Sequence, residues 1–229
     1  MIILGGVTRL TGSGLSMVQW EPIMGVLPPL NQSEWEETFL LYQQYPEYKL
    51  KNFAMSLGEF KSIFWFEYGH RLLGRSIGII FLLPFLFFLI KGKINRALTP
   101  KLIAMFVLGG LQGLMGWYMV KSGLVDDPHV SQYRLTAHLA LAVIIYAYML
   151  WVALDLLYPN INENIKNSNR KLAQLSLIIT AIIFITVLSG GFVAGTRAGF
   201  AFNTFPLMDG RLIPVGLLEL SPAWRNFFE

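Results

Sequence analysis

The run Ile77-Gly78-Ile79-Ile80-Phe81-Leu82-Leu83-Pro84-Phe85-Leu86-Phe87-Phe88-Leu89-Ile90 contains no charged residue. With the residues before it from Phe66, this run reaches the roughly 20 residues that a helix needs to cross the hydrocarbon core of a bilayer. Three further segments have the same character and similar length: Leu102–Val120, Leu135–Leu156 and Leu172–Val193. The sequence therefore predicts an all-α membrane protein built as a helical bundle.

The composition supports this class and excludes several others. Of the 229 residues, 54% are hydrophobic and 14% are charged, whereas a soluble domain is about 25% charged. The absence of cysteine excludes disulfides, thiolate zinc sites, iron–sulfur clusters and covalent haem attachment through Cys. The net charge of +4 is small, and no basic stripe with interleaved aromatic residues is present, so we expect no nucleic-acid partner.

Charge in the connections predicts the orientation in the membrane. The connection Lys91–Lys101 carries four basic residues and no acid, and the connection Tyr158–Lys171 carries Lys166, Arg170 and Lys171. By the positive-inside rule both face the cytoplasm or the mitochondrial matrix. We expect a multi-pass protein of the bacterial inner membrane or the mitochondrial inner membrane, in contact with membrane lipid.

Two histidines, His70 and His138, are the most informative residues. Each is predicted to lie about one turn inside the outer end of a span, and both spans run from outside to inside. Ionisable residues at such positions are costly and usually functional. Two neutral imidazoles at similar depth on neighbouring helices are suited to axial ligation of a haem iron. We therefore predict a haem pocket in the outer leaflet.

Glu67 shares a helix face with His70, because the two residues are three apart. A carboxylate there could orient a ligating histidine or move protons near a substrate. The structural alternative is an acid that favours the helix dipole. The third histidine, His129, lies in an outer loop, where a solvated role is the favoured interpretation.

Three arginines are predicted near the outer edge of this pocket: Arg71, Arg75 and Arg134. Guanidinium groups pair well with carboxylates such as haem propionates. Contact with lipid phosphate is an equally weighted alternative.

Two other features carry expectations about packing. A glycine face formed by Gly109, Gly110, Gly113 and Gly116 predicts close helix packing. The first outer loop, with Trp20, Trp35 and Trp65, is too long for a plain connector. We expect it to fold over the outer pocket as a lid, with these tryptophans in interfacial belts and loop cores.

A weak internal repeat links the two ends of the chain. Leu4-Gly5-Gly6-Val7-Thr8-Arg9 and Ser189-Gly190-Gly191-Phe192-Val193-Ala194 both close an inside-to-outside segment, as expected for a duplicated bundle. Residues 1–157 are then a first four-helix half with the long outer loop. Residues 158–229 are the start of a second half. Met1–Leu4 resembles the last turn of a helix, and we expect both ends to be truncated.

These segments together resemble haem A synthase of the cysteine-free type found in alphaproteobacteria and mitochondria. The matching segments are Gly5–Thr11, Ser13–Met17 with Trp20, Glu59–Trp65, Glu67–Arg71 with Gly74 and Arg75, Gln112–Leu124, Val130–Leu135 with His138, and Asn203–Met208. They cover almost the whole chain.

The resemblance implies an eight-helix bundle of two similar halves. It also implies oxidation of the methyl group of haem O to the formyl group of haem A at the outer side of the membrane, for cytochrome c oxidase, with water as the expected oxygen source. His70 and His138 match the histidine pair of the substrate haem site, where they would hold its iron. Glu67 matches the essential carboxylate. The family also holds a haem b cofactor on a second-half pair that has no counterpart here, so we expect this chain to be inactive alone.

The resemblance suggests haem O synthase and cytochrome c oxidase assembly factors as partners, and a homo-oligomer is left open. Two other functions compete. A b-type haem electron-transfer subunit would use the same histidines but would give Glu67 no role. A transporter with broken helices would need neither histidine for haem content.

Overall fold

The computed structural model describes residues 1–19, 26–124, 128–159, 169–204 and 206–227. The described residues form helices and no β-strand. In chain order the helices are α1 (Ile2–Leu10), α2 (Gln32–Tyr42), α3 (Pro46–Leu50), α4 (Leu57–Ile90), α5 (Thr99–Gly123), α6 (Gln132–Leu157), α8 (Arg170–Thr196), α9 (Ala198–Ala201) and the 3-10 helix η2 (Ala223–Phe227). Helices α4, α5, α6 and α8 are long and apolar enough to cross a membrane. The predicted all-α membrane class is confirmed.

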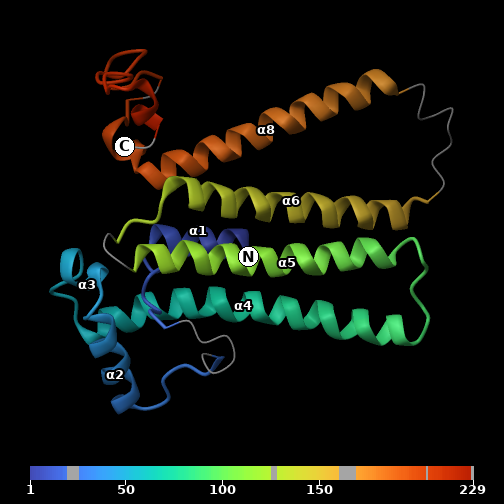
Figure 1. The fold of residues 1–229 in the computed structure, drawn as a ribbon, viewed down its shortest axis with the longest axis horizontal. Coiled ribbons are helices and arrows are strands. Elements are labelled where there is room, and N and C mark those ends of the chain that lie inside the picture. Colours follow the sequence, from blue (N-terminus) through green and yellow to red (C-terminus); the bar gives the residue numbers. More distant parts are fainter. Residues whose placement is uncertain (20–25, 125–127, 160–168, 205, 228–229) are drawn as a thin grey trace.

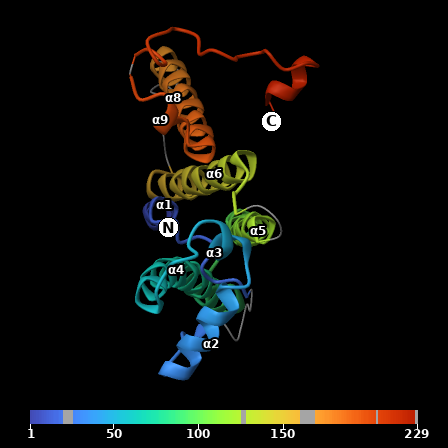
Figure 2. The same cartoon turned by 90° about the vertical axis from the view of Figure 1, so that its left-hand side faces the viewer.

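Four helices surround a common centre at one end of the bundle, which we call the outer end because the sequence predicts that it faces outward. The long helices α4, α5 and α6 lie side by side and alternate in direction (Figure 1). Figure 2 looks along them and shows α1 on the remaining side, between α4 and α6. The short α1 packs mainly on α4. Helices α4 and α6, which carry the two histidines, therefore lie on opposite sides of this group.

Helix α4 begins nine residues before the predicted start at Phe66, so that prediction was wrong. The earlier start is set by a capping box. Glu59 N donates to Ser56 Oγ at 3.3 Å, and Ser56 N donates to the Glu59 carboxylate at 2.8 Å. The apolar run alone underestimates the helix because these first turns are amphipathic and lie outside the predicted span.

The first turns of α4 are covered by the outer loop. The buried residues of this contact form an aromatic cap, which we define as Trp35 and Tyr42 of α2 together with Phe60 and Phe64 of α4. Ring centroids are 5.0 Å apart for Trp35 and Phe64 and also for Tyr42 and Phe60, within the range of favourable aromatic pairs. Trp35 is thus a loop-core residue, as expected. Trp20 lies outside the described residues.

Helix α8 packs on α6 only near its outer end, and the two helices diverge toward the other end (Figure 1). A Cβ on Gly195 would lie 2.6 Å from Gln132 Cα, and one on Gly191 would lie 2.9 Å from Thr136 Oγ1. These small residues let the two backbones approach closely. On α5 the expected close packing is wrong for Gly109, Gly110 and Gly113, which have no described neighbour within 4 Å of a built Cβ.

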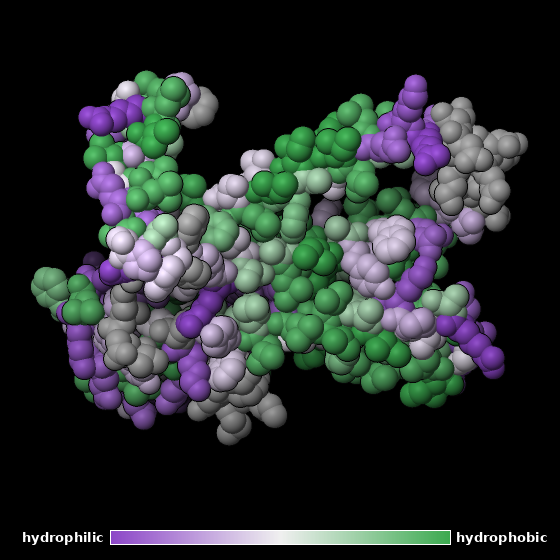
Figure 3. Space-filling model, turned by 45° about the horizontal axis from the view of Figure 1, so that its top comes forward, coloured by the Kyte–Doolittle hydropathy of each residue, from purple (hydrophilic) through white to green (hydrophobic). Residues whose placement is uncertain are grey.

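The surface matches a membrane environment. Figure 3 shows hydrophobic residues gathered across the middle of one face and hydrophilic residues toward its ends. The spans are almost entirely exposed apolar side chains, which is favourable only where lipid replaces water. At the end with the basic connections, Lys101 Nζ pairs with Asp155 at 2.5 Å. The side of the membrane that this end faces stays a prediction.

Candidate functional site

The two histidines lie on helices that run in the same direction. His70 is on α4 and His138 is on α6, and both side chains are half-buried. Helix α4 begins farther out than α6 at this end (Figure 1), and His70 is also farther from the start of its helix than His138 is. The two imidazoles are within electrostatic range of each other. The fold thus brings the predicted pair together near the outer end.

Each imidazole packs against a glycine of another helix. A Cβ built on Gly5 of α1 would lie 3.2 Å from His70 Nε2, and one on Gly116 of α5 would lie 3.2 Å from His138 Cε1. Any larger residue would push on the ring, because 3.2 Å is shorter than an ordinary van der Waals contact. Glycines at these two positions therefore make room for the rings.

The residues present fit a haem held by two imidazoles. His138 Nδ1 is buried and has no hydrogen-bond partner among the described residues. Among those residues no group of three or more His, Asp or Glu side chains could hold a bare metal ion. A haem iron needs only two axial ligands from the protein. His129 is exposed, in agreement with the favoured loop role.

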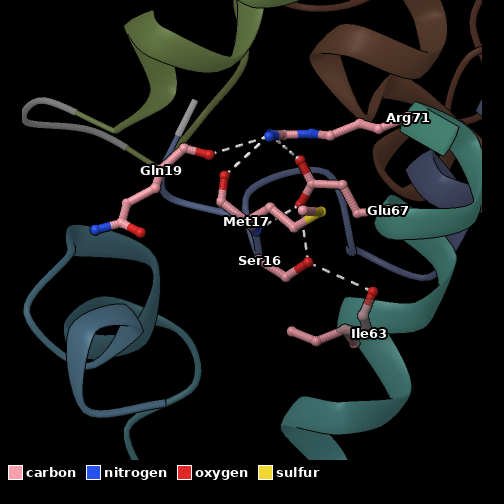
Figure 4. Close-up of polar contacts among 6 residues, drawn as sticks. All are labelled: Ser16, Met17, Gln19, Ile63, Glu67 and Arg71. Atoms are coloured by element: carbon pink, nitrogen blue, oxygen red, sulfur yellow. Dashed lines mark hydrogen bonds and ion pairs between the residues drawn. The ribbon is translucent and has the colours of Figure 1, made fainter. Parts of the chain in front are cut away.

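Glu67 is 2% exposed and sits at the centre of a network (Figure 4). One carboxylate oxygen accepts from Ser16 Oγ at 2.8 Å and from Met17 N at 2.7 Å. The other pairs with Arg71 Nη2 at 2.5 Å. Charge-assisted bonds of this kind are short and strong. Glu67 therefore anchors the chain after α1 to α4, one turn before His70.

Arg71 extends the same network. Its guanidinium donates to Met17 O at 2.9 Å and to Gln19 O at 3.3 Å (Figure 4). Ser16 and Met17 were missed by sequence reasoning, since nothing in their types indicates contact with a residue fifty positions away. A cavity of about 200 Å³ lies beside Arg71, between Met17, Val18 and the end of α5 at Trp117 and Lys121. It is smaller than the roughly 300 Å³ typical of a whole-ligand pocket.

The other two predicted arginines, Arg75 and Arg134, are not among the contacts of Glu67 drawn in Figure 4. Arg75 is one turn after Arg71 on α4 and is half-buried. The Arg134 guanidinium of α6 lies over the Tyr118 ring of α5, 4.4 Å from its centroid, a favourable cation–π distance. Contact of these arginines with propionates stays a prediction.

A second buried carboxyl, Glu47 of α3, was also missed by sequence reasoning. It is 6% exposed, and burial raises its pKa to about 7, while Lys51 opposes the rise and the charge of Glu67 adds to it. Burial also raises the pKa of Tyr42. Removal from water disfavours the charged form of both groups. The loop that covers α4 therefore contains a carboxyl that titrates near neutral pH.

Known proteins similar to this chain are named for haem A synthesis. The "Heme A synthase" of Nitrosospira multiformis is 61% identical over 229 residues, which are 100% of this chain and 64% of that protein. Those of Nitrosomonas eutropha and Parvibaculum lavamentivorans are 55% and 52% identical, over 100% of this chain and 65% of each relative. The chain thus spans slightly less than two thirds of these relatives. No solved structure matches it.

The family comparison agrees with the motifs quoted above. The model of one family, described as "Cytochrome oxidase assembly protein", matches residues 1–229. Since that match extends over every residue, the chain belongs to the cytochrome oxidase assembly protein family.

Proposed function

We propose that this chain provides the substrate haem site of a haem A synthase, an oxidoreductase that converts the methyl group of haem O to the formyl group of haem A at the outer side of the membrane. The observation that carries this proposal is the pair His70 and His138. Their helices lie on opposite sides of one group of helices, and each imidazole packs against a glycine. The names of the relatives support the same reaction.

In this proposal His70 and His138 hold the iron of haem O, the substrate, which brings the methyl group to be oxidised. Neutral imidazoles suit this role because they bind the iron without placing further charge in the membrane. Helices α4 and α6 fix the two rings from opposite sides. The small cavity beside Arg71 would admit a polar substituent such as a propionate, which Arg71 would pair.

Glu67 is the proposed catalytic carboxylate. Conversion of the methyl group to a formyl group with oxygen from water releases four protons and four electrons, and the electrons must pass to an external acceptor. Glu67 would accept protons or stabilise positive charge in that conversion. Its present partners define what this role requires. Both carboxylate oxygens are engaged, by Ser16 and Met17 on one side and Arg71 on the other. To take a proton, Glu67 must exchange one of these contacts, so its anchoring and catalytic roles would be coupled.

The apolar part of the substrate would enter from the lipid. An open apolar groove of about 390 Å³ lies on α5 and α6 and is lined by Leu111, Leu114, Met115, Trp117, Tyr118 and Leu141. An isoprenoid tail would be solvated equally well by such a groove and by lipid chains.

A second haem, the haem b cofactor, would need two histidine ligands besides His70 and His138, and the sequence contains only one further histidine, His129. Haem O synthase and oxidase assembly factors are the proposed partners, as the family description suggests assembly of the oxidase.

The test is haem extraction and chromatography from cells that express the complete gene together with haem O synthase. We expect haem A from the unmodified protein and none from Glu67→Gln or His70→Ala. Matched controls are Glu37→Gln and His129→Ala, an exposed glutamate of α2 and the exposed loop histidine, both of which should leave haem A unchanged.

Haem b alone from the unmodified protein, unchanged in Glu67→Gln, would contradict the synthase. It would favour the b-type electron-transfer subunit, which needs the histidines but not the carboxylate. Unchanged haem content in His70→Ala would contradict both.

A further inference from the structure

Gln112 contacts His138 in two ways. It lies on α5 one turn before Gly116, on the same helix face. Its amide nitrogen donates to the main-chain carbonyl of His138 at 3.1 Å and is 3.4 Å from the ring nitrogen Nε2. A Cβ built on Gly116 would lie 3.2 Å from Cε1 of the same ring. The imidazole of His138 is thus bounded by two successive turns of α5.

The orientation of the Gln112 amide follows from its partner. A backbone carbonyl can only accept hydrogen bonds, so the amide atom against it must be the nitrogen. The remaining Gln112 Oε1 is buried without a partner among the described residues. A group that faces the amide NH₂ must itself accept, so Nε2 of His138 carries the lone pair and Nδ1 carries the proton.

We infer that Gln112 is a positioning residue for His138, which keeps the imidazole in the rotamer and tautomer whose Nε2 lone pair is ready for iron. The inference rests on the proposed function to the extent that His138 binds haem. Outer partners of ligating histidines normally fix the tautomer through the nitrogen away from the metal. Here Nδ1 has no such partner among the described residues. Gln112 instead positions the ring through its hydrogen bond to the main-chain carbonyl of His138.

The two contacts differ in length, and this explains how iron could replace one of them. The 3.1 Å bond to the carbonyl is a normal hydrogen bond, whereas the 3.4 Å contact to Nε2 is long and weak. Iron can therefore take the ring nitrogen while the amide keeps its anchor on His138 O. Loss of the anchor would free the ring to rotate.

The experiment titrates the purified protein in lipid nanodiscs with ferric haem b and records the affinity and the low-spin fraction. Gln112→Met keeps the side-chain length and removes both polar contacts. We expect a roughly tenfold or greater loss of affinity and a rise in the high-spin fraction. Gln174→Met is the matched control, because Gln174 is an exposed glutamine of another span, α8, and it should change neither quantity.

The His138→Ala background separates positioning from helix packing. If Gln112 acts through His138, Gln112→Met should have no further effect there. A Gln112→Met protein with normal affinity and spin state but a lower thermal midpoint would overturn the inference, because Gln112 would then only join α5 to α6. Tighter haem binding would also overturn it, since the amide would then compete with iron. If Gln112→Met fails to fold, Gln112→Asn, which cannot reach His138 as closely, carries the same expectation.

The same data distinguish the two levels of the proposal. No effect of His138→Ala on haem affinity would contradict the haem site itself and the inference with it. A clear effect of His138→Ala with none of Gln112→Met would contradict the inference alone.

Discussion

The Gly-Gly pairs of α1 and α8 have the same place in the predicted repeat but different neighbours. In α1 the imidazole of His70 packs against the first glycine, Gly5, and no described atom of another residue lies within 4 Å of a Cβ built on Gly6. In α8 the first glycine, Gly190, is open, and the second, Gly191, receives Thr136 of α6. One pair makes room for the imidazole of His70 and the other for Thr136 of α6. A glycine pair thus predicts a close approach, but the neighbouring helices decide what approaches.

The largest effect should come from breaking the contact of α8. In Gly195→Leu the new Cβ would start 2.6 Å from Gln132 Cα, and backbone cannot yield as a side chain can. We expect a loss of about 3 kcal/mol in the free energy of unfolding, measured by denaturant titration in mixed micelles. Gly190→Leu, on the same helix with open space around it, should change stability little; equal losses in both would show that α8 packs differently.

A pH change should loosen the loop that covers the start of α4. The folded-state pKa of Glu47, about 7, is above the usual 4.5, so the folded protein binds more protons than the unfolded chain between these values. The contribution of Glu47 to stability is therefore greatest below pH 4.5 and is lost as the pH rises through 7. The expected loss between pH 5 and pH 8 is about 2 kcal/mol.

Amide hydrogen exchange of α3 at the two pH values measures this loss. The charged or titratable neighbours of Glu47 are Tyr42, Lys51, Glu67 and Arg197. After correction for the intrinsic pH dependence of amide exchange, the exchange rates of α3 should be nearly the same at both pH values in Glu47→Gln. The control Glu37→Gln, at an exposed glutamate, should keep the pH dependence. The same pH dependence in Glu47→Gln would assign it to another group.

A smaller effect should follow from the glycine beneath His70. In Gly5→Ala the methyl group would lie 3.2 Å from Nε2, so the ring must move by a few tenths of an ångström. An overpacking cost of about 1.4 kcal/mol corresponds to a roughly tenfold weaker haem affinity, measured by titration with haem b. Gly6→Ala should bind haem normally, and weakening in both variants would point to a change in α1 as a whole.

The smallest effect should come from the bond that joins α1 to the end of α8. Arg9 Nη2 donates to Ala194 O at 2.8 Å, near the end of α8. Because this contact is exposed, Arg9→Met should cost about 1 kcal/mol or less of unfolding free energy. Arg96→Met, in the exposed basic connection, is the control. A loss above that of Gly195→Leu would mean that α1 rather than α6 holds α8.

Sequence periodicity predicted the helices well and their contacts poorly. The four spans follow from long apolar runs, and the structure extends each by only a few residues except at the start of α4. That start depends on Ser56 and Glu59 and on burial of Phe60 and Phe64 under α2, neither of which an apolar run contains. The pairing of His70 with His138 was predicted from topology because alternate spans run in the same direction.

The amino-acid sequence by itself determined the membrane class, the four apolar spans and the choice of His70 and His138 as candidate ligands. It could do so because length, hydrophobicity and charge act locally along the chain. Only the tertiary structure decided that Ser16 and Met17 donate hydrogen bonds to Glu67. It also decided that Gln112 contacts His138 and that Gly5, not Gly6, packs against the ring of His70. These contacts join residues on different helices. Their partners depend on how the helices rotate and cross, which packing sets and local sequence does not.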